Sequence, residues 1–231
     1  MKEYGIIFGL MLSIFIILAV KHAFSMKGKV LIENRTKFMV RVGIFGAMSA
    51  ILYCVPFLKF PLPIFPSFLE FHFDEIPAFI AAFAYGPFSG LCVLLVKTII
   101  KLPMTNTLAI GEIADLLYSS AFILPAALYY KNHRKFKGAL IGILIGLVTQ
   151  LAVSLVMNVY IMFPFYMKLY GMDETQLLGI FQLTNPSVTD VRWSVGFIAV
   201  LPFNAIKDTA VIIVTLLVYK SLHRVIDKIA R

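Results

Sequence analysis

Long apolar segments follow one another along almost the whole chain and limit what it can fold into. They cover residues 4–20, 38–55, 76–85, 88–102, 108–130, 139–166 and 193–219. A helix needs about 20 mostly apolar residues to cross a bilayer, and only helices and closed barrels satisfy their backbone hydrogen bonds in lipid. Of the 231 residues, 60% are hydrophobic and 14% are charged, against about 25% charged in soluble domains. The sequence therefore predicts an all-α integral membrane protein that crosses the lipid bilayer several times.

Basic residues gather in three stretches beside the apolar segments. They lie within residues 21–41, 131–137 and 220–231. Because Lys and Arg mark the cytoplasmic side of a membrane protein, we expect these stretches and the C-terminus in the cytoplasm, with loop 56–75 extracellular. This placement explains the net charge of +9 without nucleic-acid binding.

The first apolar segment stands apart from the others. Lys2, the apolar run and Ala23 fit a cleavable signal peptide, but the basic stretch that follows opposes translocation. We therefore expect a retained helix with its N-terminus outside. Residues 1–37 would form this hydrophobic helix and a basic cytoplasmic linker, and residues 38–231 would form a six-helix membrane domain.

Several function classes are excluded by motifs that the sequence lacks. It contains no internal repeat, Walker motif, glycine-rich phosphate loop or nucleophile elbow, so ATP hydrolysis by the chain itself is not expected. Cys54 and Cys92 lie within apolar segments and are interpreted as small apolar fillers. No metal site is predicted.

The stretch 58–85, LKFPLPIFPSFLEFHFDEIPAFIAAFAY, is a loop that runs into an apolar helix. Prolines 56, 61, 63 and 66 prevent it from spanning the membrane as a helix, yet it is too apolar for a simple connector. It predicts a lid or wall for a flat, apolar ligand. Three acids (Glu70, Asp74 and Glu75) lie where the loop becomes the helix. His72, His133 and His223 are interpreted as solvated.

Polar side chains within the apolar segments are costly to bury and tend to mark pathways or ligand sites. Lys97 lies near the end of its segment, where it can instead extend to the membrane surface. Glu112 and Asp115 are three residues apart and share a helix face. They can line a site, or pair with Lys97 or Lys101. Asn158 can contact a ligand or join two helices by a hydrogen bond.

The segment LPFNAIKDTA combines polar groups with a helix-breaking residue. Pro202 can interrupt the helix and free backbone groups to face a cavity. Asn204 and Lys207 share a face and offer an amide and an ammonium to a polar ligand. Asp208 can instead neutralise Lys207. We expect this segment to belong to a ligand site.

Small residues in VGIFGAMSAIL form two pairs with a spacing of four. They are Gly43 with Ala47, and Gly46 with Ala50. Such pairs let another helix approach closely, either within the same bundle or from a partner subunit.

These elements occur in a recognisable order, with FPLPIFPSFLEFHFDEIPAFIAAFAYGPFSG followed by GEIADLL, FILPAALYYK and PFNAIKD. From about residue 40 to 222 the chain resembles the riboflavin-specific substrate-binding subunits, or S components, of energy-coupling factor (ECF) transporters. The first block resembles a pattern of S components in general, and PFN-x-x-K is the element that points to a flavin. The N-terminal segment falls outside the resemblance.

The resemblance implies a compact six-helix S-component bundle with a vitamin site in its outer half, under the long loop. Asn204, Lys207 and Asn158 would bind polar atoms of riboflavin. Phe65 and Phe68 would shield or stack on its isoalloxazine ring. Lys97 matches a lysine of the family's third core helix, and Glu112 lies in the matching GEIADLL element. Aromatic surfaces suit the rings, and amides and ammonium groups suit the polar edge and the ribityl hydroxyls.

The resemblance also implies partners. In this family a membrane scaffold subunit and two ATP-hydrolysing subunits complete an importer, and the loaded S component topples in the membrane to turn its site inward. Here Gly43, Gly46, Ala47 and Ala50 would contact the scaffold. The chain would be a transport subunit, not an enzyme, with no cofactor besides its flavin cargo.

Two features depart from the family pattern, and other functions stay open. They are the N-terminal helix and the long outer loop 168–192, which can extend the lid. With Lys59, Lys168 and Arg192 on the outer side, FMN is an alternative cargo. Thiamine, pantothenate or a modified-base precursor are further alternatives. An intramembrane enzyme using Glu112, Asp115 or His72 is the remaining hypothesis, and it lacks a recognisable nucleophile or metal-ligand set.

Overall fold

The computed structural model describes residues 35–229, and within them five helical stretches are long and apolar enough to cross a membrane. They are α2 (Arg35–Cys54), α4 (Pro87–Lys101), α5 (Ile110–Asn132), α6 (Phe136–Met157) continued by the π-helical turn η3 (Asn158–Met162) and α7 (Phe163–Tyr170), and α9 (Trp193–Val195) continued by the π-helical turn η4 (Gly196–Val200) and α10 (Leu201–Ile229). The shorter apolar helix α3 (Glu75–Tyr85) completes the core. The all-helical prediction is confirmed for this part, whereas the helix expected at residues 4–20 lies outside the described residues.

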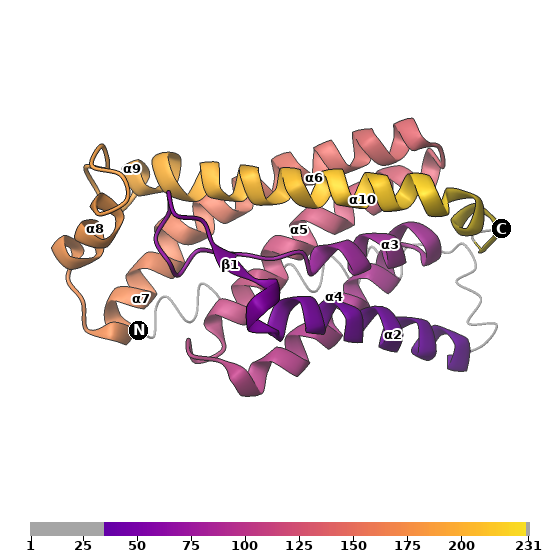
Figure 1. Ribbon diagram of the computed structural model, residues 1–231, viewed down its shortest axis with the longest axis horizontal. Helices are drawn as coiled ribbons and strands as arrows, with labels where there is room; N and C mark the ends of the chain where they lie inside the picture. The colour runs from indigo at the N-terminus through magenta and orange to yellow at the C-terminus, as the bar shows by residue number, and fades with distance from the viewer. Residues whose placement is uncertain (1–34, 230–231) are drawn as a thin grey trace.

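The helices run alongside one another, and the two ends of the bundle differ (Figure 1). The start of α2, the α5–α6 connection and the end of α10 lie at one end. The proline-rich loop, α7, α8 (Glu174–Gln182) and α9 lie toward the other. The described residues of the three basic stretches, at the start of α2, in the α5–α6 connection and toward the end of α10, therefore lie at one end of the molecule. The side of the membrane on which this end lies stays a prediction.

An aromatic core fixes α3, α5 and α10 to one another at the basic end. The ring of Phe79 meets that of Phe122 edge-on at 4.7 Å, and Phe83 lies 4.6 Å from Tyr130. The hydroxyls of Tyr130 and Tyr219 hydrogen-bond at 2.9 Å. Because these phenols satisfy each other, this part of the core buries its aromatic surface with little polar cost.

Helices α5 and α6 approach each other closely through glycines. A Cβ on Gly146 would lie 2.1 Å from the carbonyl oxygen of Phe122, and one on Gly142 would lie 2.6 Å from that of Ala126. Only glycine allows the two backbones to touch in this way. The glycines are spaced four apart, so they lie on one face of α6.

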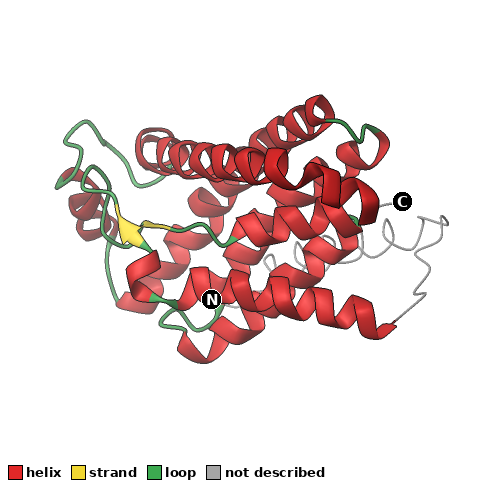
Figure 2. Cartoon of the chain, turned by 45° about the vertical axis from the view of Figure 1, so that its right-hand side comes forward, coloured by secondary structure: helices red, strands yellow, loops and turns green. Residues whose placement is uncertain are grey.

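The proline-rich loop folds back on itself, and Figure 2 shows its two short strands beside the helices. Strands β1 (Phe60–Pro61) and β2 (Glu70–Phe71) pair antiparallel, with Phe60 opposite Phe71. Lys59 Nζ donates to Glu70 Oε2 at 2.5 Å. The loop is therefore a folded element that covers one end of the bundle.

The outer segment 168–192 contains a helix that the sequence reading did not predict. Asp173 caps α8 by accepting from the backbone N–H of Gln176, whose side chain binds back to the backbone of Asp173. Phe181 of α8 is fully buried, and its ring meets Phe68 of the proline-rich loop at 5.5 Å. The loop and α8 thus form one continuous cover.

Exposed aromatic rings gather at the start of the last helical stretch. Trp193 stacks on Phe197, and Tyr160 meets Trp193 edge-on at 5.8 Å. All three side chains are exposed. Such clusters are typical of the membrane–water interface, so we expect the lipid headgroups to lie near this cluster.

Candidate ligand-binding site

Lys97 is the centre of a buried ionic network below the proline-rich loop. Its ammonium binds Asp74, lies 2.8 Å from Asp115 Oδ2 and sits 4.8 Å from the centre of the Tyr53 ring. Its side chain is fully buried. The alternative in which Lys97 extends to the membrane surface is therefore wrong, and the predicted pairing with Asp115 is confirmed.

Lys207 forms the second buried ion pair. Its Nζ donates to Glu75 Oε1 at 2.7 Å, which links α10 to the start of α3. Asp208, the alternative partner for Lys207, makes no ion pair within the described part of the chain, and its Oδ2 has no hydrogen-bond partner there. Lys207 therefore pairs with Glu75 of α3 and not with Asp208, its neighbour in the sequence.

His72 is buried, so its interpretation as a solvated residue is wrong. Its side chain is 8% exposed, its Nδ1 binds Asp74, and its ring lies 5.2 Å from that of Tyr53. The cause is the β1–β2 fold-back, which holds the residue after β2 against α2. His133 is exposed as expected, and the side chain of His223 lies outside the described residues.

Four possible metal-ligand side chains meet in this network. The donor atoms of His72, Asp74, Glu75 and Asp115 lie within 4.8 Å of one another. The ammonium groups of Lys97 and Lys207 bind three of these carboxylates. The chain therefore supplies its own cations here, and the geometry fits an ion-pair network that ties together α3, α4, α5 and α10.

A group of amides lies beside this network, between α6 and α10. Asn204 Nδ2 donates to the carbonyl oxygen of Val200 at 2.9 Å, and Gln150 Nε2 donates to Asn204 Oδ1 at 3.3 Å. The interruption expected at Pro202 takes the form of the π-helical turn η4, which ends at Val200, while the helix continues. Asn204 and Lys207 remain on one side of α10, and both are buried.

Asn158 lies where α6 passes into η3. Its Nδ2 donates to the carbonyl oxygen of Ser154 at 2.8 Å and to the Tyr118 hydroxyl of α5 at 3.2 Å. Asn158 therefore joins two helices by a hydrogen bond, which is one of the two roles expected from the sequence. Its side chain remains partly exposed.

Glu112 and Asp115 do not form a common site. Glu112 Oε2 accepts from the hydroxyls of Thr105 and Thr107 at 2.7 and 3.0 Å, whereas Asp115 turns to Lys97. Glu112 thereby holds the turn before α5. The backbone of that turn has positive φ at Leu108 (51°) and Ala109 (69°), which is uncommon for residues with a Cβ.

The two loop phenylalanines have different surroundings. Phe65 is buried, and its ring meets that of Phe203 edge-on, with 5.4 Å between the ring centres. Phe203 is the residue directly before Asn204 in the sequence. Phe68 is half exposed and packs on α8. The structure thus packs Phe65 against α10, on the residue that precedes Asn204, whereas Phe68 packs on α8.

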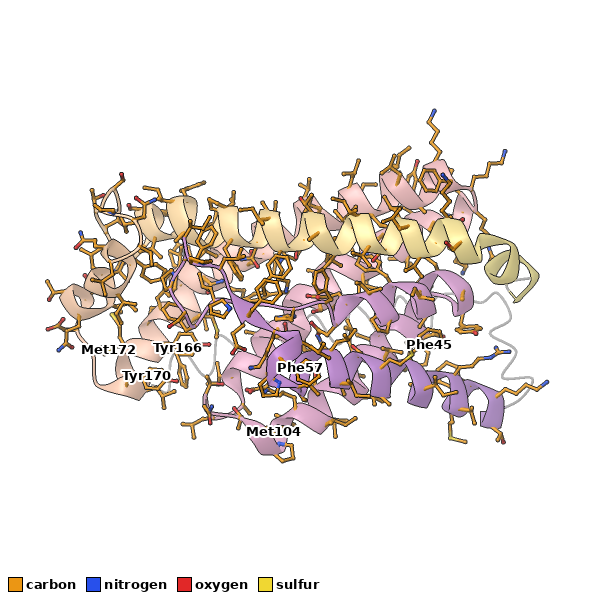
Figure 3. The ribbon with its side chains drawn as sticks, in the orientation of Figure 1. Phe45, Phe57, Met104, Tyr166, Tyr170 and Met172 are labelled. Atoms are coloured by element: carbon orange, nitrogen blue, oxygen red, sulfur yellow. The ribbon has the colours of Figure 1, made fainter. Side chains whose placement is uncertain are left out.

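A cavity of about 410 Å³ lies between α7, α8 and the chain before α9. Its walls are mostly apolar, from residues such as Phe163 and Met167, and Lys168, Arg192 and Asp173 also line it. Figure 3 labels Met172, another lining residue, at this end of the molecule. The residues predicted to bind riboflavin are not among its lining, whereas Lys168 and Arg192, which suggested FMN as an alternative cargo, are.

The two pairs of small residues on α2 face different surroundings. Gly46 and Ala50 are buried, and a Cβ on Gly46 would lie 2.5 Å from Val96 of α4. Gly43 and Ala47 are exposed, and a Cβ on Gly43 would meet nothing within 4 Å. Packing within the bundle accounts for Gly46 and Ala50. Of the two pairs, the pair of Gly43 and Ala47 is therefore the one that a partner helix could approach.

Sequence reasoning missed Gln150 and the role of Glu75. Gln150 is 2% exposed, and Glu75 is equally buried. The available signal was spacing, because Gln150, Ser154 and Asn158 continue the series of glycines on α6 at every fourth position. For Glu75, the sequence places an acid at the first turn of an apolar helix but does not indicate its partner.

Comparisons with known proteins show that the fold is that of an S component, and they also give the family. Residues 37–219 match the family described as ECF transporter, substrate-specific component. The chain belongs to this family and is a membrane-embedded transport subunit, not an enzyme.

Individual relatives agree. The chain is 30% identical to the riboflavin transporter RibU of Staphylococcus aureus (strain TCH60), over 79% of this chain and 89% of that protein. It is 26% identical to the riboflavin transporter FmnP of Bacillus subtilis (strain 168), over 78% and 90%. The solved structure of the S component of a bacterial ECF transporter matches with a TM-score of 0.64 and 26% identity, covering 83% of this chain and 98% of that one.

Proposed function

We propose that the protein captures riboflavin at the extracellular side and delivers it inward together with an ECF scaffold subunit and two ATPase subunits. The relatives named riboflavin transporters support the cargo. The observation that carries the proposal is that Phe65 packs on Phe203 of α10, the helix that also carries the buried amide of Asn204 and the buried ammonium of Lys207. Rings suit the isoalloxazine, and the polar groups suit its imide edge and ribityl chain.

The orientation rests on charge. The start of α2, the α5–α6 connection and the end of α10, which carry the described basic residues, lie at one end of the bundle, and the loop and α8 lie toward the other. With the basic end in the cytoplasm, the loop covers a site that opens to the exterior. Cysteine labelling of single-cysteine variants in the loop from outside intact cells tests this; labelling only after permeabilisation would contradict it.

Flavin binding is tested on the detergent-purified protein. We expect a flavin absorption spectrum, or quenching of riboflavin fluorescence on titration. Asn204→Leu should weaken riboflavin binding about 5- to 150-fold, because it removes a buried hydrogen-bonding group worth about 1–3 kcal/mol. The control Asn106→Leu, at an exposed position, should leave the affinity unchanged.

A protein that neither carries nor quenches flavin would contradict the proposal. Saturable binding of thiamine or pantothenate by that protein would assign the alternative cargo.

FMN is a second candidate cargo because Lys168 and Arg192 line one cavity. Titrations with riboflavin and FMN compare the two. If the phosphate binds there, replacing both residues with Gln lowers the affinity for FMN and leaves that for riboflavin unchanged. Equal changes for both ligands would exclude the phosphate contact.

The scaffold partner is expected on α2. Gly43 and Ala47 lie beside the exposed side chains of Met39, Ile44 and Met48. Gly43→Leu should abolish uptake in cells while flavin binding by the purified protein is retained. The control Val148→Phe, which also enlarges an exposed apolar side chain, should preserve uptake. Normal uptake by Gly43→Leu would exclude this face.

A further inference from the structure

Gln150 has the most buried side chain of the amide group and an acceptor without a partner. Its side chain is 2% exposed, and Oε1 has no hydrogen-bond partner within the described part of the chain. A buried acceptor that is left without a hydrogen bond destabilises the protein. Such atoms in a ligand-binding protein call for a donor, and a ligand is a natural source.

The hydrogen bonds around Gln150 fix which of its atoms is available. Asn204 donates through Nδ2 to the carbonyl oxygen of Val200, so its Oδ1 is the atom that meets Gln150. The carboxamide of Gln150 must then direct Nε2 to Asn204. This assignment leaves Gln150 Oε1 as the acceptor without a partner. The oxygen and the nitrogen of the Asn204 amide each make one hydrogen bond already and can each make one more.

The imide edge of a flavin has the complementary pattern. It presents one donor, N3–H, between two carbonyl oxygens. A carboxamide matches half of this edge, because its oxygen accepts from N3–H while its nitrogen can donate to the adjacent carbonyl. Lys207, three residues beyond Asn204 on the same side of α10, adds an ammonium donor to this group.

We propose that Gln150 determines the specificity of the site for an unsubstituted imide, with Gln150 Oε1 accepting the hydrogen bond from flavin N3–H. This inference rests on the proposed function, since it assumes that a flavin binds between α6 and α10. It identifies the ligand class as planar rings with an N–H flanked by carbonyls.

The test compares three ligands by fluorescence titration of the full-length protein. Riboflavin carries both N3–H and the ribityl chain, 3-methylriboflavin lacks the N3 donor, and lumiflavin lacks the ribityl chain. We expect the wild-type protein to bind 3-methylriboflavin about 10-fold or more weakly than riboflavin, the scale of one buried hydrogen bond. Equal affinities would overturn the proposal without any variant being needed.

Gln150→Met keeps the length of the side chain and removes its polar groups. We expect it to weaken riboflavin and lumiflavin to a similar extent and to bind riboflavin and 3-methylriboflavin within about 3-fold of each other, because the hydrogen bond that separates them is gone. The control Thr149→Val, one residue earlier on α6 and partly exposed, should retain the discrimination. Gln150→Leu serves in the same comparison if the Met variant does not fold.

The possible outcomes separate the inference from the proposed function. A loss confined to riboflavin in the Gln150 variants would assign Gln150 to the ribityl hydroxyls and overturn the imide contact. Undiminished discrimination in these variants would overturn it too. If none of the three flavins binds the wild-type protein, the proposed function fails as well.

Discussion

The two halves of α6 use the same helical face in opposite ways. Toward the basic end, Gly142 and Gly146 let the backbone of α5 approach to contact distance. Toward the loop, the same face carries Gln150, Ser154 and, at the start of η3, Asn158. Gln150 donates to Asn204 of α10, and Asn158 donates to Tyr118 of α5. The half of α6 with the glycines packs its backbone tightly against α5, which we call the tight seam. The other half carries polar side chains that line the candidate site.

This difference explains how a small membrane protein can hold a polar site. Buried polar groups are tolerated only where their partners are held in place, and close backbone packing at the other end supplies that rigidity. Variants that alter one half should therefore affect folding, and variants of the other half should affect ligand binding.

The largest effect is expected in the glycine half. Gly146→Leu would place side-chain atoms into the backbone of α5, where even a Cβ would lie 2.1 Å from a carbonyl oxygen. We expect a loss in free energy of unfolding of about 3 kcal/mol or more, seen as a low yield of monodisperse protein. The control Gly43→Leu meets no neighbour and should fold normally. Normal yield and thermal stability of Gly146→Leu would contradict the tight seam.

A second effect concerns the ion pair at the polar half. Lys207→Met leaves Glu75 buried without its cation, and breaking such a pair typically costs about 3–5 kcal/mol. We expect a lower thermal midpoint and no flavin binding. The double variant Glu75→Gln/Lys207→Met should regain much of the stability but not the flavin affinity. Recovery of both would mean that Lys207 serves the fold alone.

The smallest effect is expected at the helix that covers the polar half. The backbone N–H of Gln176 and the hydroxyl of Thr175 donate to Asp173 and lower the pKa of its carboxyl below the ordinary value of 3.8. A lowered pKa in the folded state means that the cap stabilises α8 above pH 4 and is lost as the pH falls through the lowered pKa. Hydrogen exchange of α8 should rise in Asp173→Ala at neutral pH, and acid should add little further. Unchanged exchange in this variant would show that Phe181 alone holds α8.

The sequence predicts helices well because hydrophobic length decides them in a membrane. Helix α3 begins at Glu75 and α4 at Pro87, each within one residue of the start expected from the apolar pattern. In the turn between them Gly86 adopts φ 100°, a conformation that glycine reaches without strain.

The pairing of buried charges could not be predicted in the same way. Lys207 lies next to Asp208 in the sequence but binds Glu75, 132 residues earlier. His72 was misjudged because its burial depends on how the loop folds back. Which helix faces which is a property of the packed bundle, so single-residue polarity marks the candidate residues without identifying their partners.

The short length of α3 has a consequence for where a bound molecule would lie. Its 11 residues rise about 16 Å, roughly half of the 30 Å hydrocarbon layer. The remaining depth above α3 falls to the β1–β2 loop, and non-helical backbone at that depth must be shielded from lipid by surrounding protein. A cargo held beneath this loop would therefore rest within the thickness of the bilayer, and it would enter or leave by displacing the loop, not by sliding along the headgroups.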